Sequence, residues 1–227
     1  MINTWEDIPQ CFQAQCKSAL GEISAFPYII YLPAYTWGNR TTNELLVCLS
    51  NNDLIIFEKL EKDIRAKDYN LNDIIYVNRG TMLLYSWIRI FGYEKNCITS
   101  LVIEFNTAAK QIFEKLLRTI RSKIGKFEAL TDEYSLSKEL SKFDYLTSVD
   151  YKFMNYARES IIPTENVETI LLQPAIYKKY FKYLKKTLCS AHMHILTDKE
   201  LIIISEDDPG MKAYRTKNTC LHGPLFH

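Results

Sequence analysis

The chemistry this sequence could perform is most concentrated where lysines alternate with aromatic side chains. The stretch runs from position 177 to 186 and reads Tyr-Lys-Lys-Tyr-Phe-Lys-Tyr-Leu-Lys-Lys. Its five lysines are Lys178, Lys179, Lys182, Lys185 and Lys186. A lysine near an anionic membrane contributes about 1 kcal/mol of binding, so five of them could hold the protein weakly at such a surface. The lysines are therefore a candidate site for anionic lipid or another anion.

The same stretch also fits an amphipathic helix, which is the interpretation we prefer. Tyr177, Phe181, Leu184 and Leu188 would then face the core, and the lysines would form a solvated face. Runs of charged residues are most often ordinary protein surface.

A second candidate site gathers cysteine and histidine near the end of the chain, where all four histidines lie. His192 and His194 would share one face of a strand and could present two imidazoles to Zn²⁺ or a similar ion, with Cys220 and His222 completing the shell. The sequence has no Cys-x-x-Cys pair and fits no zinc motif. We prefer the alternative in which Met193 points inward and the two histidines face water.

Recognisable catalytic motifs are missing from the sequence. It contains no phosphate-binding loop, no Gly-x-Gly-x-x-Gly, no Gly-x-Ser-x-Gly and no His-Glu-x-x-His. The acidic cluster at 206–208 beside Pro209 is typical of a solvated turn. We therefore expect a protein that is not an enzyme and needs no cofactor, and its small-molecule ligand, if it has one, is unknown.

Composition bounds the remaining function classes. Lys plus Arg number 28 and Asp plus Glu 27, so no overall positive field favours nucleic acid. The N-terminus has neither a basic nor an apolar signal region, and no apolar run reaches the roughly 20 residues of a membrane helix. Six scattered cysteines in a chain of this length are expected to be reduced. We expect a cytoplasmic protein that associates with a protein partner or with itself, with an anionic membrane surface as the alternative.

The elements that must position these residues begin with a short amphipathic helix and a series of strands. Apolar runs at 26–32, 44–49, 54–57, 71–77, 81–91 and 97–105 predict antiparallel strands joined by hairpins. The charged segment 58–68 is not expected in the core, and Asn78-Arg79-Gly80 predicts a turn. The next segment, 107–124, predicts the strongest helix. Its apolar stripe at three- and four-residue spacing must cover the preceding sheet, and Gly125 follows it.

The second part of the chain repeats the beginning of the first. After a polar segment expected to be a linker, a helix is predicted at 149–161. Positions 29–34 then correspond to 170–175, and 53–56 correspond to 200–203. Too few residues follow 201 to build the remaining strands and the closing helix. The second unit is therefore expected to be an incomplete copy.

The order of elements in the first unit resembles the pleckstrin-homology-like superfold, especially its bacterial PH-like and GRAM-like members. The residues that carry the resemblance are the segments 83–90 and 101–105 followed by the helix 107–124, within about 25–125. The resemblance implies a bent sheet or partial barrel with one open corner closed by the helix, and a binding or scaffolding role. It also implies that, where such domains bind phosphoinositides, basic residues between the first two strands hold the headgroup; the 177–186 stretch occupies that position in the second unit.

These observations predict an α+β protein in three parts. Residues 1–126 form a PH-like domain with an N-terminal helix, 127–147 a linker and 148–227 an incomplete second PH-like repeat. The expected function is a non-enzymatic interaction or assembly module. Binding of anionic membranes through 177–186 is the alternative, and metal binding by the Cys/His cluster is a second alternative.

Overall fold

The computed structural model describes the residues 1–21, 27–37, 40–50, 52–61, 63–94, 97–124, 133–181, 184–206 and 219–224. Side chains are further left undescribed at 37, 40, 133–135, 180, 181, 184, 185 and 219–224. The fold is mixed α+β, and the described strands form several antiparallel sheets and no closed barrel. No helix within these residues is long and apolar enough to cross a membrane.

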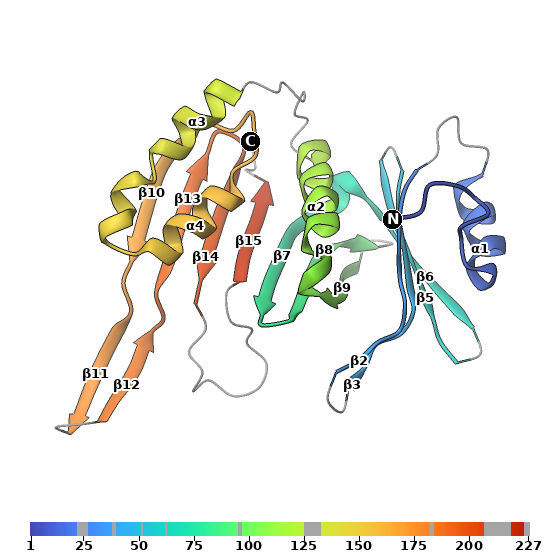
Figure 1. Cartoon of the computed structure of the whole chain (residues 1–227), viewed down its shortest axis with the longest axis horizontal. Helices are drawn as coiled ribbons and strands as arrows, with labels where there is room; N and C mark the ends of the chain where they lie inside the picture. Colours follow the sequence, from blue (N-terminus) through green and yellow to red (C-terminus); the bar gives the residue numbers. More distant parts are fainter. Residues whose placement is uncertain are drawn as a thin grey trace.

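The first unit is a helix, a meander of strands and a closing helix (Figure 1). Its helices are α1 (Gln10–Leu20) and α2 (Lys110–Ile124), with 3₁₀ turns η1 (Leu71–Asp73) and η2 (Thr107–Ala109). Its strands are β1 (Tyr28–Leu32), β2 (Thr36–Trp37), β3 (Arg40–Thr41), β4 (Leu45–Leu49), β5 (Asp53–Lys59), β6 (Ile64–Asn70), β7 (Ile74–Met82), β8 (Tyr85–Glu94) and β9 (Cys97–Asn106). The strands β1-β4-β5-β6 make one sheet, while β7, β8 and β9 lie at the end of a second.

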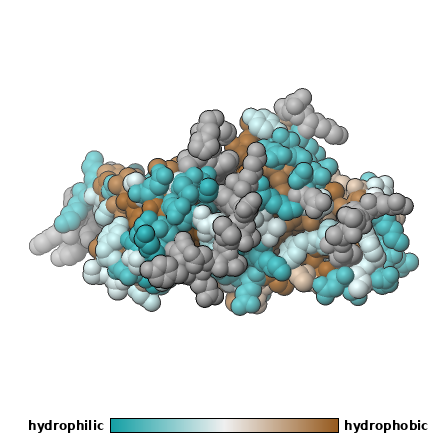
Figure 2. Space-filling model, turned by 90° about the horizontal axis from the view of Figure 1, so that it is seen from above, coloured by the Kyte–Doolittle hydropathy of each residue, from teal (hydrophilic) through white to brown (hydrophobic). Residues whose placement is uncertain are grey.

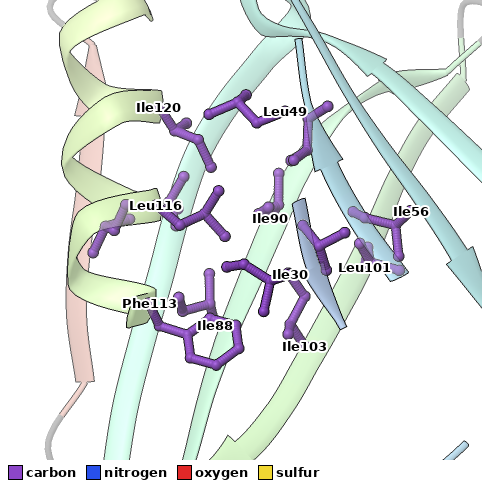
Figure 3. Close-up of a cluster of buried hydrophobic side chains, with 14 of the residues drawn as sticks. Ile30, Leu49, Ile56, Ile88, Ile90, Leu101, Ile103, Phe113, Leu116 and Ile120 are labelled. Carbon is purple, nitrogen blue, oxygen red and sulfur yellow. The ribbon is translucent and has the colours of Figure 1, made fainter. Parts of the chain in front are cut away.

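Helix α2 closes the space between these two sheets, as its apolar stripe predicts. Phe113, Leu116 and Ile120 are buried and point toward strand residues such as Ile88 and Ile90 (Figure 3). The ring of Phe113 stacks on Phe105 with centroids 3.8 Å apart. The 3.6-residue period of the helix therefore supplies one wall of the main core.

One local prediction for the first unit was confirmed and one was wrong. The charged segment at 58–68 has no buried residue among those described, as expected, and its second half lies in β6, which pairs with β5 at the edge of the sheet. The expected turn at Asn78-Arg79-Gly80 lies inside β7, and the chain turns instead at Leu83 and Leu84. An edge strand tolerates charge because one side of it faces water.

The outer face of the first sheet is covered by α1. Phe12 and Cys16 of the helix pack on Ile29, Cys48 and Phe57 of the sheet. The Sγ atoms of Cys16 and Cys48 lie 3.9 Å apart as free thiols, so these two cysteines act as small hydrophobic side chains.

The second unit begins with helices and continues with six strands (Figure 1). The helical segments are α3 (Glu133–Ser141), η3 (Asp144–Ser148) and α4 (Tyr151–Ser160), and the strands are β10 (Val167–Gln173), β11 (Ile176–Phe181), β12 (Leu184–Cys189), β13 (His192–Thr197), β14 (Glu200–Ser205) and β15 (Thr219–Pro224). The predicted linker 127–147 thus contains α3, and Phe143 and Leu146 are fully buried. The linker prediction missed these few apolar side chains, which anchor the segment on the core of the second unit.

The strands pair in the same register within each of the two units. In the first, Ile29 lies opposite Cys48, and Cys48 opposite Ile55. In the second, Ile170 lies opposite Ile195, and Ile195 opposite Ile202. A short hairpin separates the first two long strands in both units, β2–β3 in one and β11–β12 in the other. The positions aligned from the sequence therefore occupy equivalent places in the two sheets.

Strand β15 joins the units into one continuous sheet. It pairs with β14 on one side and with β7 on the other, giving the order β10-β13-β14-β15-β7-β8-β9. The units consequently lie side by side along the long axis (Figure 1). Seen from above, apolar areas are interspersed with polar side chains (Figure 2).

Candidate functional site

The lysine-rich stretch forms a β-hairpin, so the prediction of an amphipathic helix was wrong. Strands β11 and β12 pair only with each other. In Figure 1 the hairpin extends beyond the rest of the second unit. Lys178, Lys179 and Lys186 are exposed, while Lys182 and the side chain of Lys185 lie outside the described residues. Extended strands place the lysines on both faces of the hairpin, which a helix would not do.

The register of this hairpin places lysine opposite lysine. Lys178 lies across from Lys186, and Lys179 across from Lys185. Directly opposite residues in an antiparallel pair have Cβ atoms about 5 Å apart, and like charges at that spacing are destabilising. Ile176, Tyr177 and Leu188 on the same hairpin are also exposed. The hairpin therefore combines concentrated positive charge with exposed apolar side chains.

The proposed metal ligands are divided by the sheet register. His192 and His194 pair with Ser205 and Ile203 of β14. Cys220 and His222 pair with Ile204 and Ile202, the residues of β14 that alternate with those two. The structure thus assigns the two histidines and the two C-terminal residues to different rows of the sheet. No group of three or more metal-ligating side chains occurs in the described part of the chain.

The alternative interpretation of the histidine strand is supported. Met193 is fully buried, and His192 and His194 are half-buried on the other face. The rings of the two histidines meet edge to face, with centroids 5.2 Å apart. Cys189 lies beside them, with its Sγ atom 3.7 Å from Nδ1 of His192.

The sheet of the second unit has one face, which carries these histidines, that the described residues cover only in part. In the first unit the equivalent face is the core: all seven of its positions are buried, namely Ile30, Leu32, Leu45, Val47, Leu49, Leu54 and Ile56. None of the seven equivalents is buried, namely Leu171, Gln173, His192, His194, Leu196, Leu201 and Ile203. Leu171 is 61% exposed and Leu201 is 36% exposed. We call these seven residues the open face.

The opposite face of the same sheet is covered by α4, just as α1 covers the first unit. Phe153, Met154 and Ala157 of α4 pack on Ile195 and Ile202. Among the described residues, the second unit therefore has the outer layer of the first unit, without a second sheet or a closing helix over its inner face.

The open face carries no lysine, arginine or carboxylate side chain. Its members are four aliphatic side chains, one amide and two imidazoles. Partial burial lowers the pKa of His194, and the charge of neighbouring His192 lowers it further, which favours the neutral ring. Half-buried aliphatic groups without lysine or glutamate among them are typical of the centre of a protein interface.

A buried charge cluster holds the two units together. Arg121 of α2 donates from Nε to Glu200 at the start of β14, at 2.7 Å, and from Nη1 to the backbone oxygen of Ser160, at 2.9 Å. It also donates to Glu165, at 3.2 Å. The side chains of Arg121, Glu165 and Glu200 are at most 8% exposed.

The ionisation of Glu165 in this cluster is strongly perturbed. Burial and the neighbouring Glu200 raise its pKa, the positive charge of Arg121 opposes them, and the net pKa is about 9. Glu165 is therefore protonated at neutral pH, and the single positive charge of Arg121 balances the carboxylate of Glu200. The cluster is a neutral structural contact between the units rather than an anion site.

One pocket lined by described residues is small. It lies between α2 and the β7–β8 hairpin and leaves about 20 Å³, enough for a water molecule. Trp87 is buried over Gly80, while Arg89 on the same strand is exposed. The pocket is too small for a substrate.

Sequence reasoning missed both the open face and the role of Arg121. Arg121 looks like one of several cations at the end of a helix, and its partners lie 44 and 79 residues further along the chain. Leu171 and Leu201 alternate as buried strand residues do, so only the comparison of the two units reveals that they are exposed. The repeat was the one available signal.

No protein-family model matches this sequence, and searches among curated proteins and solved structures find no similar chain.

Proposed function

We propose that the protein is a non-enzymatic interaction module with a pleckstrin-homology-like first unit, and that it assembles with a second copy of itself through the open face. The resemblance to the PH-like superfold is supported by a curled antiparallel meander closed by one amphipathic helix. The observation that carries the assembly is the contrast between seven buried positions in the first unit and seven unburied equivalents in the second.

Self-association is favoured by the chemistry of the open face. Two copies related by a two-fold axis bring the same uncharged surface together, so no like charges meet. Sheets pack face to face about 10 Å apart, with their side chains interdigitated. Leu171, Leu201 and Ile203 of one copy would then lose the water that they contact in the single chain.

The size of the open face sets the expected strength. Three strands about 4.8 Å apart and about six residues long cover roughly 300 Å². A standard protein interface buries about 800 Å² per partner, so we expect a weak dimer that forms as concentration rises. A small reversible contact of this kind suits a protein that assembles and disassembles.

Analytical ultracentrifugation over a wide range of concentrations tests the proposal. The average mass of the unmodified chain should rise toward twice its monomer value, and Leu201→Glu should abolish the rise, because it places a charge in the contact. The matched control is Leu60→Glu, since Leu60 is 37% exposed but lies in the first unit. A chain that stays monomeric throughout, or equal effects of the two substitutions, would contradict the proposal.

A further inference from the structure

The two histidines of the open face lie on its central strand. β13 runs between β10 and β14 (Figure 1), and it places His192, His194 and Leu196 on the open face. His194 is the middle one of the three and lies between Leu171 of β10 and Ile203 of β14. When two copies pack through the open face about a two-fold axis, the axis passes through the middle of the shared patch. The His194 side chains of both copies then come together beside this axis.

The separation of the two histidine rings within one chain fits a shared metal ion. A Zn–N bond is about 2.0–2.1 Å long, so the centroid of a bound imidazole lies about 3.2 Å from the ion. Two imidazoles on one tetrahedral ion therefore have centroids roughly 5 Å apart. The rings of His192 and His194 have centroids 5.2 Å apart, and their planes stand at 68° to each other. Rotation of the side chains alone can bring both rings onto one ion.

A hydrogen bond to the backbone fixes which nitrogen of His192 is free to bind a metal. Its Nδ1 atom lies 3.0 Å from the carbonyl oxygen of Ser190. A carbonyl oxygen only accepts hydrogen bonds, so Nδ1 carries the proton and the lone pair of the neutral ring is on Nε2. Histidines that bind metals usually donate their other N–H to a carboxylate, a backbone carbonyl or water in this way. His192 is therefore held in the tautomer that a metal ligand needs.

A single chain offers too few ligands to complete such a site. Structural zinc sites have four protein ligands, and catalytic sites have three with water in the fourth position. No group of three or more metal-ligating side chains occurs in the described residues. The thiol of Cys189 lies 3.7 Å from Nδ1 of His192, which is the side of the ring that carries the proton. The remaining imidazoles have to come from another molecule, and a second copy presents them at the same place.

We propose that His192 and His194 of two copies together bind one Zn²⁺ ion at the centre of the dimer. This inference rests on the proposed self-association through the open face. Four imidazole nitrogens suit Zn²⁺, which prefers a tetrahedral shell. Calcium and magnesium require oxygen ligands, which the side chains of the open face supply only through the amide of Gln173. An ion bound by both copies strengthens a contact that is weak by its area alone, because it binds the dimer better than the single chain.

Analytical ultracentrifugation of the chain without a polyhistidine tag, in EDTA and in Zn²⁺, tests the proposal. An ion that binds only the dimer strengthens association by the factor 1 + [Zn²⁺]/Kd, so free Zn²⁺ at about 100 times its Kd should lower the dissociation constant of the dimer about 100-fold. Metal analysis after gel filtration should find about one zinc ion per two chains. Co²⁺ in place of Zn²⁺ should give the strong visible absorption bands of a tetrahedral site.

Two substitutions separate the metal site from the apolar contact. His194→Leu removes a ligand but keeps the open face apolar, so it should abolish the effect of Zn²⁺ and leave association in EDTA unchanged or stronger. His192→Leu should act in the same way. The matched controls are Cys189→Ala, which changes the other side of the His192 ring, and His222→Ala, which removes a histidine from the alternate rows. Both controls should respond to Zn²⁺ as the unmodified chain does, and thermal unfolding in EDTA should show that all four variants are folded.

Three results would overturn the metal site. They are an association constant that Zn²⁺ leaves unchanged, one zinc ion bound by each single chain, and a loss of the zinc response in Cys189→Ala equal to that in His194→Leu. The second and third would indicate a site within one chain. A chain that dimerises in EDTA but does not respond to Zn²⁺ refutes the metal site and leaves the proposed self-association intact. A chain that stays monomeric in both conditions refutes both proposals.

Discussion

Replacement of Arg121 by methionine should destabilise the protein more than any change at an exposed ion pair. Arg121 provides the positive charge for Glu165 and Glu200, and all three side chains are at most 8% exposed. Removing one partner from a buried ion pair typically costs about 3–5 kcal/mol, because the remaining charge has neither water nor a counterion. A typical protein has about 5–15 kcal/mol of stability in total, so the variant should fold but only marginally.

Urea denaturation followed by circular dichroism measures this loss as the change in the free energy of unfolding. The matched control is Lys110→Met, which breaks the exposed pair between Lys110 and Glu159 and should cost about 1 kcal/mol or less. Adding Glu165→Gln and Glu200→Gln to Arg121→Met should recover most of the stability, since the buried charges are then gone.

The loss of stability caused by Arg121→Met should also depend on pH. At pH 5 the deficit of Arg121→Met should be smaller than at pH 7, because carboxylates left without a cation can take up protons. The account of the cluster is refuted if Arg121→Met costs less than the Lys110→Met control, or if the triple variant is no more stable than the single one.

Three further predictions concern the ionisation of Glu165 and the packing of the core. Glu165 keeps its proton to about pH 9 in the folded protein but ionises near pH 4.3 in the unfolded chain. Its contribution to stability is therefore fully present below about pH 4 and declines toward pH 9, by at most about 1.4 kcal/mol per pH unit, and Glu165→Gln should flatten this decline in melting curves across that range. Gly80→Ala should lower the free energy of unfolding by about 1–3 kcal/mol, because the new methyl group would lie 1.7 Å from Cζ2 of Trp87. Urea titration followed by tryptophan fluorescence measures this change, and an unchanged midpoint would show that the indole moves freely. Leu116→Ala should cost about 2–5 kcal/mol by the same titration, since Leu116 is fully buried between α2 and the sheets, and a loss below 1 kcal/mol would place the helix outside the core.

Periodic patterns in the sequence were sufficient to predict the helices and strands that bury one face. The stripe of Phe113, Leu116 and Ile120 predicts α2 and the sheet beneath it, because a helix with such a stripe has to cover apolar surface. The aligned positions of the two units predict the shared register, since a one-residue slip would turn every buried side chain outward. These signals are local or repeated, so they can be interpreted without knowing how the rest of the chain folds.

The secondary structure of the charged segments was the hardest feature to predict from the sequence. The 177–186 stretch alternates in a way that fits both a helical face and a two-residue period, and only pairing with a neighbouring strand decides between them. The second half of the 58–68 segment is also a strand, β6, because it pairs with the edge of β5.

Only the tertiary structure decided which apolar faces are covered and where charges meet. Leu54 and Leu201 occupy equivalent positions in the two sheets, yet one is buried and the other is 36% exposed, because burial depends on what another part of the chain lays over a strand. Arg121 finds its carboxylates through the contact between the units. The amino-acid sequence alone determined α1, α2, α4, most strands and their repetition, whereas long-range packing determined α3 and the surfaces that can bind.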